Sequence, residues 1–139
     1  MRASLTRTVG FHAVHRYYRP EWTEERNREV FGPLADPPGH GHDYRCGVTV
    51  GGIIDRMGMV VDLQLLDSVL HDEVLTPLAG KHLNLDLPTF AYGQTLPTCE
   101  AIAAYLFPRI AARLPAGVVL ERVRIEEDPT LYADCTGSI

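Results

Sequence analysis

The chain has 139 residues, which suits a single domain (residues 1–139) with one hydrophobic core. Hydrophobic residues make up 45% of it and charged residues 22%, as in an ordinary soluble globular protein. The net charge of −5 argues against a nucleic-acid-binding surface, and no apolar run approaches the roughly 20 residues that span a membrane.

The cysteines and the N-terminal segment bear on location. Cys46, Cys99 and Cys135 are far apart and form no C-x-x-C pair, so we expect reduced thiols rather than disulfides. The N-terminal segment lacks the continuous apolar stretch of a signal peptide. Both features predict a cytoplasmic protein.

The first part of the chain predicts a strand and a short helix. Residues 4–16 alternate loosely between apolar and polar side chains, as in a strand with Phe11, Ala13 and His15 on one face. A short helix is predicted over 23–30, after an N-terminal cap at Thr23.

A second strand is predicted over residues 41–54. Period-2 alternation places His40 and His42 on one face of it, together with the apolar side chains that follow. Residues 55–59 have the composition of a hairpin turn.

Two longer helices are predicted next. One covers 63–77 behind an N-cap at Asp62, and the other covers 99–114 behind an N-cap at Thr98. Pro108 should kink the second helix or break its hydrogen-bond ladder locally.

The chain ends in a predicted hairpin, with strands over 118–128 and 130–135. In the first of these strands, period 2 places five side chains on one face: Val119, Glu121, Val123, Ile125 and Glu127. Glu127 is thus predicted to point inward at the end of a strand.

This order of elements predicts an α+β fold, with an antiparallel four-stranded sheet covered on one face by two helices. Such a sheet has exposed edge strands, and pairing between copies of the chain is one way to cover them.

The histidines suggest a metal site. A catalytic zinc ion takes three protein ligands and keeps a fourth position open. His40 and His42 can reach one ion from the same strand face, and His15 is the natural third ligand. Spacing alone leaves two other interpretations open: a hydrogen-bonded core histidine, and a surface turn bracketed by glycines.

Six motifs occur in order along nearly the whole chain. They are "FHAVH" (11–15), "FG…GHGHDY" (31–44), "MGMVVDL" (57–63), "KHLN" (81–84), "PTCE" (97–100) and "RVRIEED" (122–128). Together they resemble the 6-pyruvoyl-tetrahydropterin and 6-carboxy-tetrahydropterin synthases. The resemblance implies the tunnelling fold, in which copies of the chain pair edge to edge into a β-barrel trimer, two of which stack as a hexamer. It also implies Zn²⁺ on His15, His40 and His42.

The resemblance further implies where a small-molecule substrate binds. Glu127 stands where these synthases grip the amidine edge of a pterin, and a carboxylate can accept two parallel hydrogen bonds from such an edge. Thr98 and Glu100 are similar to residues that flank the pterin pocket, although capping of a helix explains both equally well.

The sequence departs from the family at the proton-transfer groups. The catalytic cysteine expected before the His-Gly-His is Leu34, and the expected Asp-His pair is Ala79 and Gly80. Asp36 and His82 lie two residues further along the same segments and are the candidate substitutes, against interpretations as a turn residue and a packed loop side chain.

Three functions are consistent with these residues. The first is a diverged zinc-dependent lyase or cyclase that polarises a carbonyl or enolate oxygen of a pterin-like or other metabolite. The second is a pterin synthase that acts on dihydroneopterin triphosphate with a relocated base. The third is a zinc-bearing protein that binds a ligand without turning it over.

Overall fold

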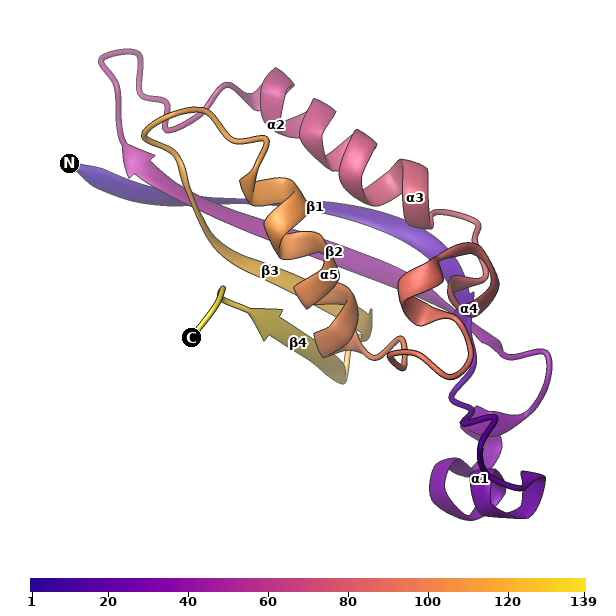
Figure 1. Ribbon diagram of the computed structural model, residues 1–139. Coiled ribbons are helices and arrows are strands. Elements are labelled where there is room, and N and C mark those ends of the chain that lie inside the picture. The colour runs from indigo at the N-terminus through magenta and orange to yellow at the C-terminus, as the bar shows by residue number, and fades with distance from the viewer.

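A computed structural model of residues 1–139 consists of one antiparallel sheet with helices on one of its faces (Figure 1). The strands are β1 (Arg2–His15), β2 (His40–Ile53), β3 (Val119–Asp128) and β4 (Leu131–Cys135), in the order β1-β2-β3-β4. This is the α+β architecture that the sequence predicts. None of the helices combines the length and the apolar character needed to cross a membrane.

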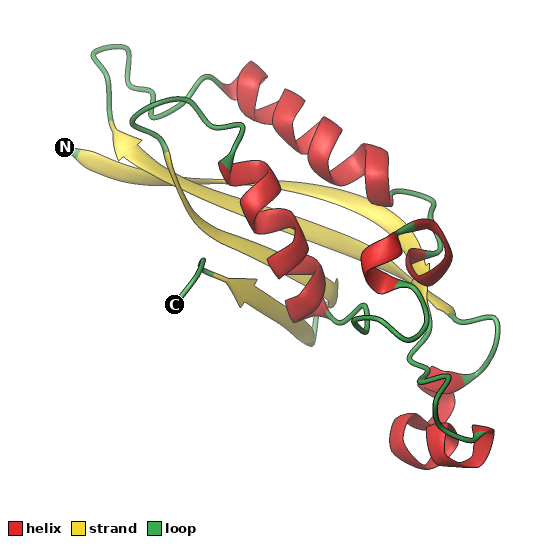
Figure 2. Ribbon diagram, viewed as in Figure 1, coloured by secondary structure: helices red, strands yellow, loops and turns green.

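The helix predicted over 63–77 is continuous but not uniform. It consists of α2 (Leu63–Leu70), one wider π-helical turn (His71–Leu75) and α3 (Thr76–Leu78). The Asp62 carboxylate caps its start by accepting a hydrogen bond from the backbone N–H of Gln64 at 2.9 Å. The helix packs along the sheet (Figure 2).

The second long helix, α5 (Cys99–Ala111), crosses the same face of the sheet and begins where the sequence predicts. The Thr98 hydroxyl accepts a hydrogen bond from the N–H of Ala101 at 3.1 Å. The helix continues through Pro108 and ends at Ala111, three residues before the predicted end at 114. Pro108 has no N–H to donate to the preceding turn, so the last turn is weakly held.

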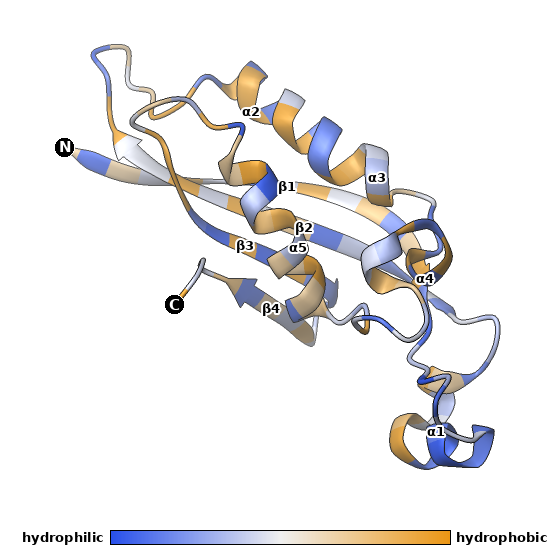
Figure 3. Ribbon diagram, in the orientation of Figure 1, coloured by the Kyte–Doolittle hydropathy of each residue, from blue (hydrophilic) through white to orange (hydrophobic).

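The smaller helices lie between these elements. α1 (Glu24–Phe31) projects away from the sheet at one end and is mostly hydrophilic (Figure 3). The buried residue of α1, Asn27, holds the helix against the preceding loop. Its side chain accepts a hydrogen bond from the N–H of Arg19 at 2.7 Å and donates one to the Arg19 carbonyl at 2.9 Å. α4 (Leu83–Asp86) is a single turn that the sequence pattern did not reveal.

A register shift in β3 makes part of its predicted inward face wrong. Thr49 pairs with Arg122, but Val50 pairs with Leu120, so Glu121 is an extra residue in β3. Leu120 consequently points into the core, whereas Val119 is 54% exposed, against the prediction that Val119 and Glu121 face inward.

A second shift in β3 occurs at the functional end of the sheet. Glu126 pairs with Tyr132 and Asp128 pairs with Leu131, which leaves Glu127 as the additional residue. The Glu127 side chain points inward as the sequence predicts, in phase with Val123 and Ile125, and is only 11% exposed.

Residues 55–59 form a tight turn, but not the predicted hairpin. The Asp55 carboxylate accepts from the N–H groups of Met57 and Met59, and Gly58 has φ +88°. The chain then enters α2 rather than a second strand, because Asp62 caps a helix immediately afterwards.

The core lies between the sheet and its helices, so the packing can be tested by shortening one large side chain in this core. Replacing the fully buried Leu106 with alanine should lower the free energy of unfolding by about 2–5 kcal/mol, through lost apolar contact and the cavity left behind. Denaturant titration measures this. Leu85→Ala is the matched control, because Leu85 is 68% exposed and its loss should change stability by less than about 0.5 kcal/mol.

Candidate metal centre

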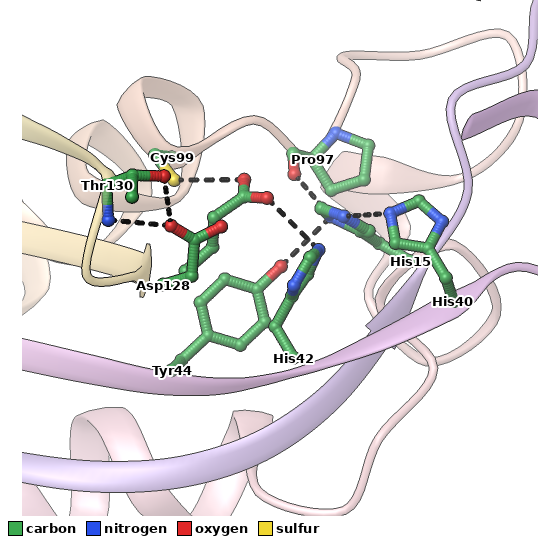
Figure 4. Close-up of polar contacts among 9 residues, drawn as sticks. His15, His40, His42, Tyr44, Pro97, Cys99, Asp128 and Thr130 are labelled. Atoms are coloured by element: carbon green, nitrogen blue, oxygen red, sulfur yellow. Dashed lines mark hydrogen bonds and ion pairs between the residues drawn. The ribbon is translucent and has the colours of Figure 1, made fainter. Parts of the chain in front are cut away.

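Three imidazoles meet where β1 ends and β2 begins (Figure 4). His15, the last residue of β1, pairs with His40, the first residue of β2, and His42 follows on the same face. Their ligand atoms all lie within 4.8 Å of one another, and the Nε2 atoms of His15 and His40 are 3.0 Å apart.

The hydrogen bonds of His15 determine which of its nitrogens carries the proton. Nδ1 lies 2.9 Å from the carbonyl oxygen of Pro97, which can only accept, so Nδ1 is the protonated nitrogen. The Tyr44 hydroxyl lies 3.0 Å from the same atom. Nε2 therefore presents its lone pair to the other two histidines, which is the tautomer that a metal ligand needs.

The surroundings lower the pKa of two of the three histidines, His15 and His40. Burial lowers the pKa of His15 to about 4, with smaller contributions in the same direction from His40 and His42, although the hydrogen bond to Pro97 opposes the shift. Burial and then His42 also lower the pKa of His40. Neutral imidazoles bind metal, whereas protonated ones do not.

His42 supplies the observation that favours a ligand at this place. Its Nε2 atom is buried and has no hydrogen-bond partner. Glu127 Oε2 lies 3.1 Å away but is not aligned for a hydrogen bond. A buried polar atom without a partner is uncommon, and a divalent cation would satisfy it. Three imidazole nitrogens this close together fit the protein donor set of catalytic zinc.

Glu127 faces the histidines from β3. One carboxylate oxygen lies against His42, and the other accepts a hydrogen bond from Cys99 Sγ at 3.3 Å. No lysine or arginine pairs with this carboxylate. A mostly buried carboxylate without a cationic partner can accept further hydrogen bonds from a ligand.

A family model described as 6-pyruvoyl tetrahydropterin synthase matches residues 4–138. The chain belongs to this family. It is 37% identical over 127 residues to the 6-pyruvoyl tetrahydrobiopterin synthase of Homo sapiens, covering 91% of this chain and 86% of that protein. It is 30% identical over 127 residues to the dihydroneopterin monophosphate aldolase of Pyrococcus furiosus, covering 91% of each.

A solved structure supports the same assignment. The 6-pyruvoyl tetrahydropterin synthase of Caenorhabditis elegans matches with a TM-score of 0.89 at 30% identity, over 99% of this chain and 97% of that one. The sheet with helices on one face is therefore the tunnelling fold, and the chain is an enzyme of the pterin-synthase kind.

The positions that lack the proton-transfer groups of the family have local structural roles. Leu34 is 40% exposed, and its carbonyl accepts from the N–H of Tyr17 at 3.0 Å. Gly80 has φ +72°, which suits glycine, and its N–H donates to the His12 carbonyl at 2.7 Å. Ala79 precedes it without any titratable group.

His82 lies close to the candidate metal centre. Its backbone forms a bridge with Val14, next to His15, and it is near enough to lower the pKa of His15 slightly. Its Nε2 atom donates to the Pro38 carbonyl at 2.7 Å, so Nδ1 carries a lone pair, and Nδ1 is buried without a partner.

The remaining predicted residues lie around the centre rather than in it. Asp36 is exposed and lines a separate polar pocket with Arg16 and Arg28. Thr98 caps α5, and Glu100 is exposed in the first turn of that helix.

Two residues near Glu127 were not predicted from the sequence. The Tyr17 ring lies 5.0 Å from that of His15, and burial followed by the charge of Glu127 raises the pKa of Tyr17. Cys99 is 4% exposed and contacts Glu127 directly. Tyr17 follows the end of β1 in a loop, where no periodicity indicates direction, but the place of Cys99 in "PTCE" could have revealed it.

The low pKa of His15 links the stability of the metal-free protein to pH. The unfolded chain protonates His15 near 6.5, whereas the folded chain does so only near 4. Between these values the unfolded state binds more protons, so stability should fall as the pH drops from about 6.5 to about 4, and level off below that. The shift corresponds to a loss on the order of 3 kcal/mol.

Denaturant titrations of the metal-free protein at several pH values in this window measure the loss. His15→Asn should flatten the pH dependence, whereas His12→Asn, on the opposite face of β1, should leave it unchanged. Equal slopes for the wild type and His15→Asn would contradict the assignment.

Proposed function

We propose that this protein is a zinc-dependent lyase that makes or breaks a C–C or C–O bond in a reduced pterin. The proposal is supported by two nitrogen atoms that are available to bind a metal ion. The hydrogen bond from His15 Nδ1 to the Pro97 carbonyl leaves a lone pair on His15 Nε2, and His42 Nε2 is buried without a hydrogen-bond partner. When bound, zinc supplies Lewis-acid polarisation of a carbonyl or enolate oxygen of the substrate.

Glu127 anchors the substrate in this proposal. A pterin presents parallel N–H donors along its amidine edge, and a carboxylate accepts them in pairs. The Glu127 carboxylate has no lysine or arginine partner to compete with such donors. Thr98 and Glu100 would border the pocket, since Glu100 lies near enough to raise the pKa of both Tyr17 and Cys99.

His82 is the favoured proton acceptor. Its Nδ1 lone pair is buried and unpartnered, and Nε2 is fixed by the Pro38 carbonyl. A neutral imidazole of this kind can take a proton from a substrate hydroxyl or carbon. Asp36 is the second candidate and would act only if its loop carried it from the arginine-lined pocket towards the histidines.

The reaction type follows from what the site retains. Leu34, Ala79 and Gly80 cannot transfer protons, while the histidines and Glu127 remain. Aldol-type cleavage needs a polarised oxygen and one base, and the aldolase name of the Pyrococcus furiosus relative supports it. The synthase reaction on dihydroneopterin triphosphate is the second candidate, favoured by the name of the human relative.

We also propose that the enzyme is a homo-oligomer, a trimer or a hexamer. β1 and β4 are the edge strands of the sheet, and each leaves one row of backbone groups without a partner strand. Edge-to-edge pairing of β1 with β4 of another copy would satisfy both rows.

The metal centre can be tested without an activity assay. Purified protein should contain one zinc ion per chain by elemental analysis. Alanine at His15, His40 or His42 should weaken zinc binding by more than about 100-fold. Loss of a residue that only hydrogen-bonds a metal ligand costs roughly 10–100-fold, and loss of the ligand itself should cost more. Alanine at His12 or His71, both exposed and outside the cluster, should leave zinc content unchanged. Metal-free wild-type protein would contradict the proposal.

The reaction can be tested by incubating zinc-loaded enzyme with dihydroneopterin monophosphate or triphosphate and identifying products by mass spectrometry. A shortened pterin with a released two-carbon fragment supports aldol cleavage, and released triphosphate supports the synthase reaction. Binding without either product would contradict both.

The proposed role of Glu127 as substrate anchor can be tested in the same assay with a Glu127 variant. Glu127→Gln should lower kcat/KM by about one to two orders of magnitude, since hydrogen bonds to a charged group contribute roughly 1.5–3 kcal/mol. Glu126→Gln is the matched control, because Glu126 lies on the opposite sheet face beside Arg45.

A further inference from the structure

The Glu127 carboxylate has a single side-chain hydrogen-bond donor, and that donor is a thiol. Cys99 Sγ lies 3.3 Å from Oε1, whereas His42 Nε2 lies 3.1 Å from Oε2 without hydrogen-bond alignment (Figure 4). Cys99 is the first residue of α5, directly after the capping residue Thr98, and it is 4% exposed. The start of a helix thus holds the thiol against an acid on β3.

Two opposing effects act on this thiol. The start of a helix favours a thiolate, which would make Cys99 a nucleophile. Burial and the neighbouring Glu127 carboxylate act in the other direction and dominate, raising the pKa of Cys99 to about 12. The S–H group therefore persists at neutral pH and can donate a hydrogen bond.

The carboxylate needs such a donor to have a defined orientation. The last torsion of a glutamate side chain is broad and roughly two-fold, so packing alone restrains it weakly. A donor on Oε1 fixes this torsion and keeps Oε2 on the His42 side. Each carboxylate oxygen has two lone pairs, so the thiol leaves both oxygens able to accept from a ligand.

We propose that Cys99 is a positioning residue, whose S–H···Oε1 hydrogen bond orients the Glu127 carboxylate for the amidine edge of the substrate. The inference rests on the proposed role of Glu127 as the substrate anchor. Cys46 and Cys135 have no such contact with an acid, so the role belongs to Cys99 alone.

The contact between thiol and carboxylate can be tested without substrate. In protein labelled with [¹³Cβ]cysteine, NMR follows the ionisation of each thiol, and Cys99→Ser assigns the Cys99 signal. Glu127→Gln should increase the thiolate fraction of Cys99 at a given alkaline pH at least about tenfold, because a negative acceptor is lost. Glu126→Gln, on the opposite face, should not change it. An unchanged Cys99 titration in Glu127→Gln would overturn the proposal.

The positioning role can be tested with neopterin, a fluorescent pterin that presents an amidine edge. Cys99→Ala should weaken neopterin binding about three- to tenfold, and Cys99→Ser, which keeps a donor, should restore it to within about twofold. In a Glu127→Gln background, Cys99→Ala should have no further effect, whereas a purely structural role would give additive losses.

The outcomes separate the two proposals. If Glu127→Gln weakens binding but the Cys99→Ala loss is additive, the positioning role is wrong and the anchor stands. If Glu127→Gln does not weaken neopterin binding, the anchor is wrong, whatever the NMR titration of Cys99 gives.

Discussion

The site depends on the register between β1 and β2. The two strands pair without a shift from Arg2 opposite Ile53 to His15 opposite His40. Because side chains alternate between faces, a slip of one residue would turn either His15 or the His40 and His42 pair away from the others. The hydrogen bond from His15 to the Pro97 carbonyl then ties this corner to the segment that leads into α5. The same contact that selects the tautomer of His15 thus brings the start of α5, with Cys99, next to the histidines.

Glu127, on the opposite side of the site, lies where the regular pairing of β3 ends. Glu127 is the additional residue of a β-bulge, and it keeps the inward direction of Val123 and Ile125, which precede it in regular alternation. Its carboxylate faces His42 at the end of the regular part of β3, and the thiol of Cys99 completes its surroundings.

Periodicity predicted those parts of the site that lie on regular strands. His15, His40 and His42 were placed correctly, because β1 and β2 follow the period of two throughout. The same rule failed for Val119 and Glu121, since the bulge at Glu121 is not visible in a single sequence. Glu127 was predicted to point inward and does, because it keeps the alternation of Val123 and Ile125, which lie beyond the bulge at Glu121. Tyr17 lies in a loop and Cys99 at a helix start, where direction is determined by tertiary contacts.

The buried groups of the site differ in whether they carry a proton at neutral pH. His15 can accept through Nε2, because its proton is on Nδ1, and burial keeps this imidazole neutral. The buried Nε2 atom of His42 has no hydrogen-bond partner. Around Glu127 the hydroxyl and thiol groups keep their protons, because burial and the carboxylate charge raise the pKa of Tyr17, Tyr44 and Cys99. Under the proposed function, such a site would orient and polarise a substrate while exchanging few protons itself. Chemistry that needs a single proton acceptor, such as cleavage beside a polarised oxygen, therefore suits it better than a sequence of several proton transfers.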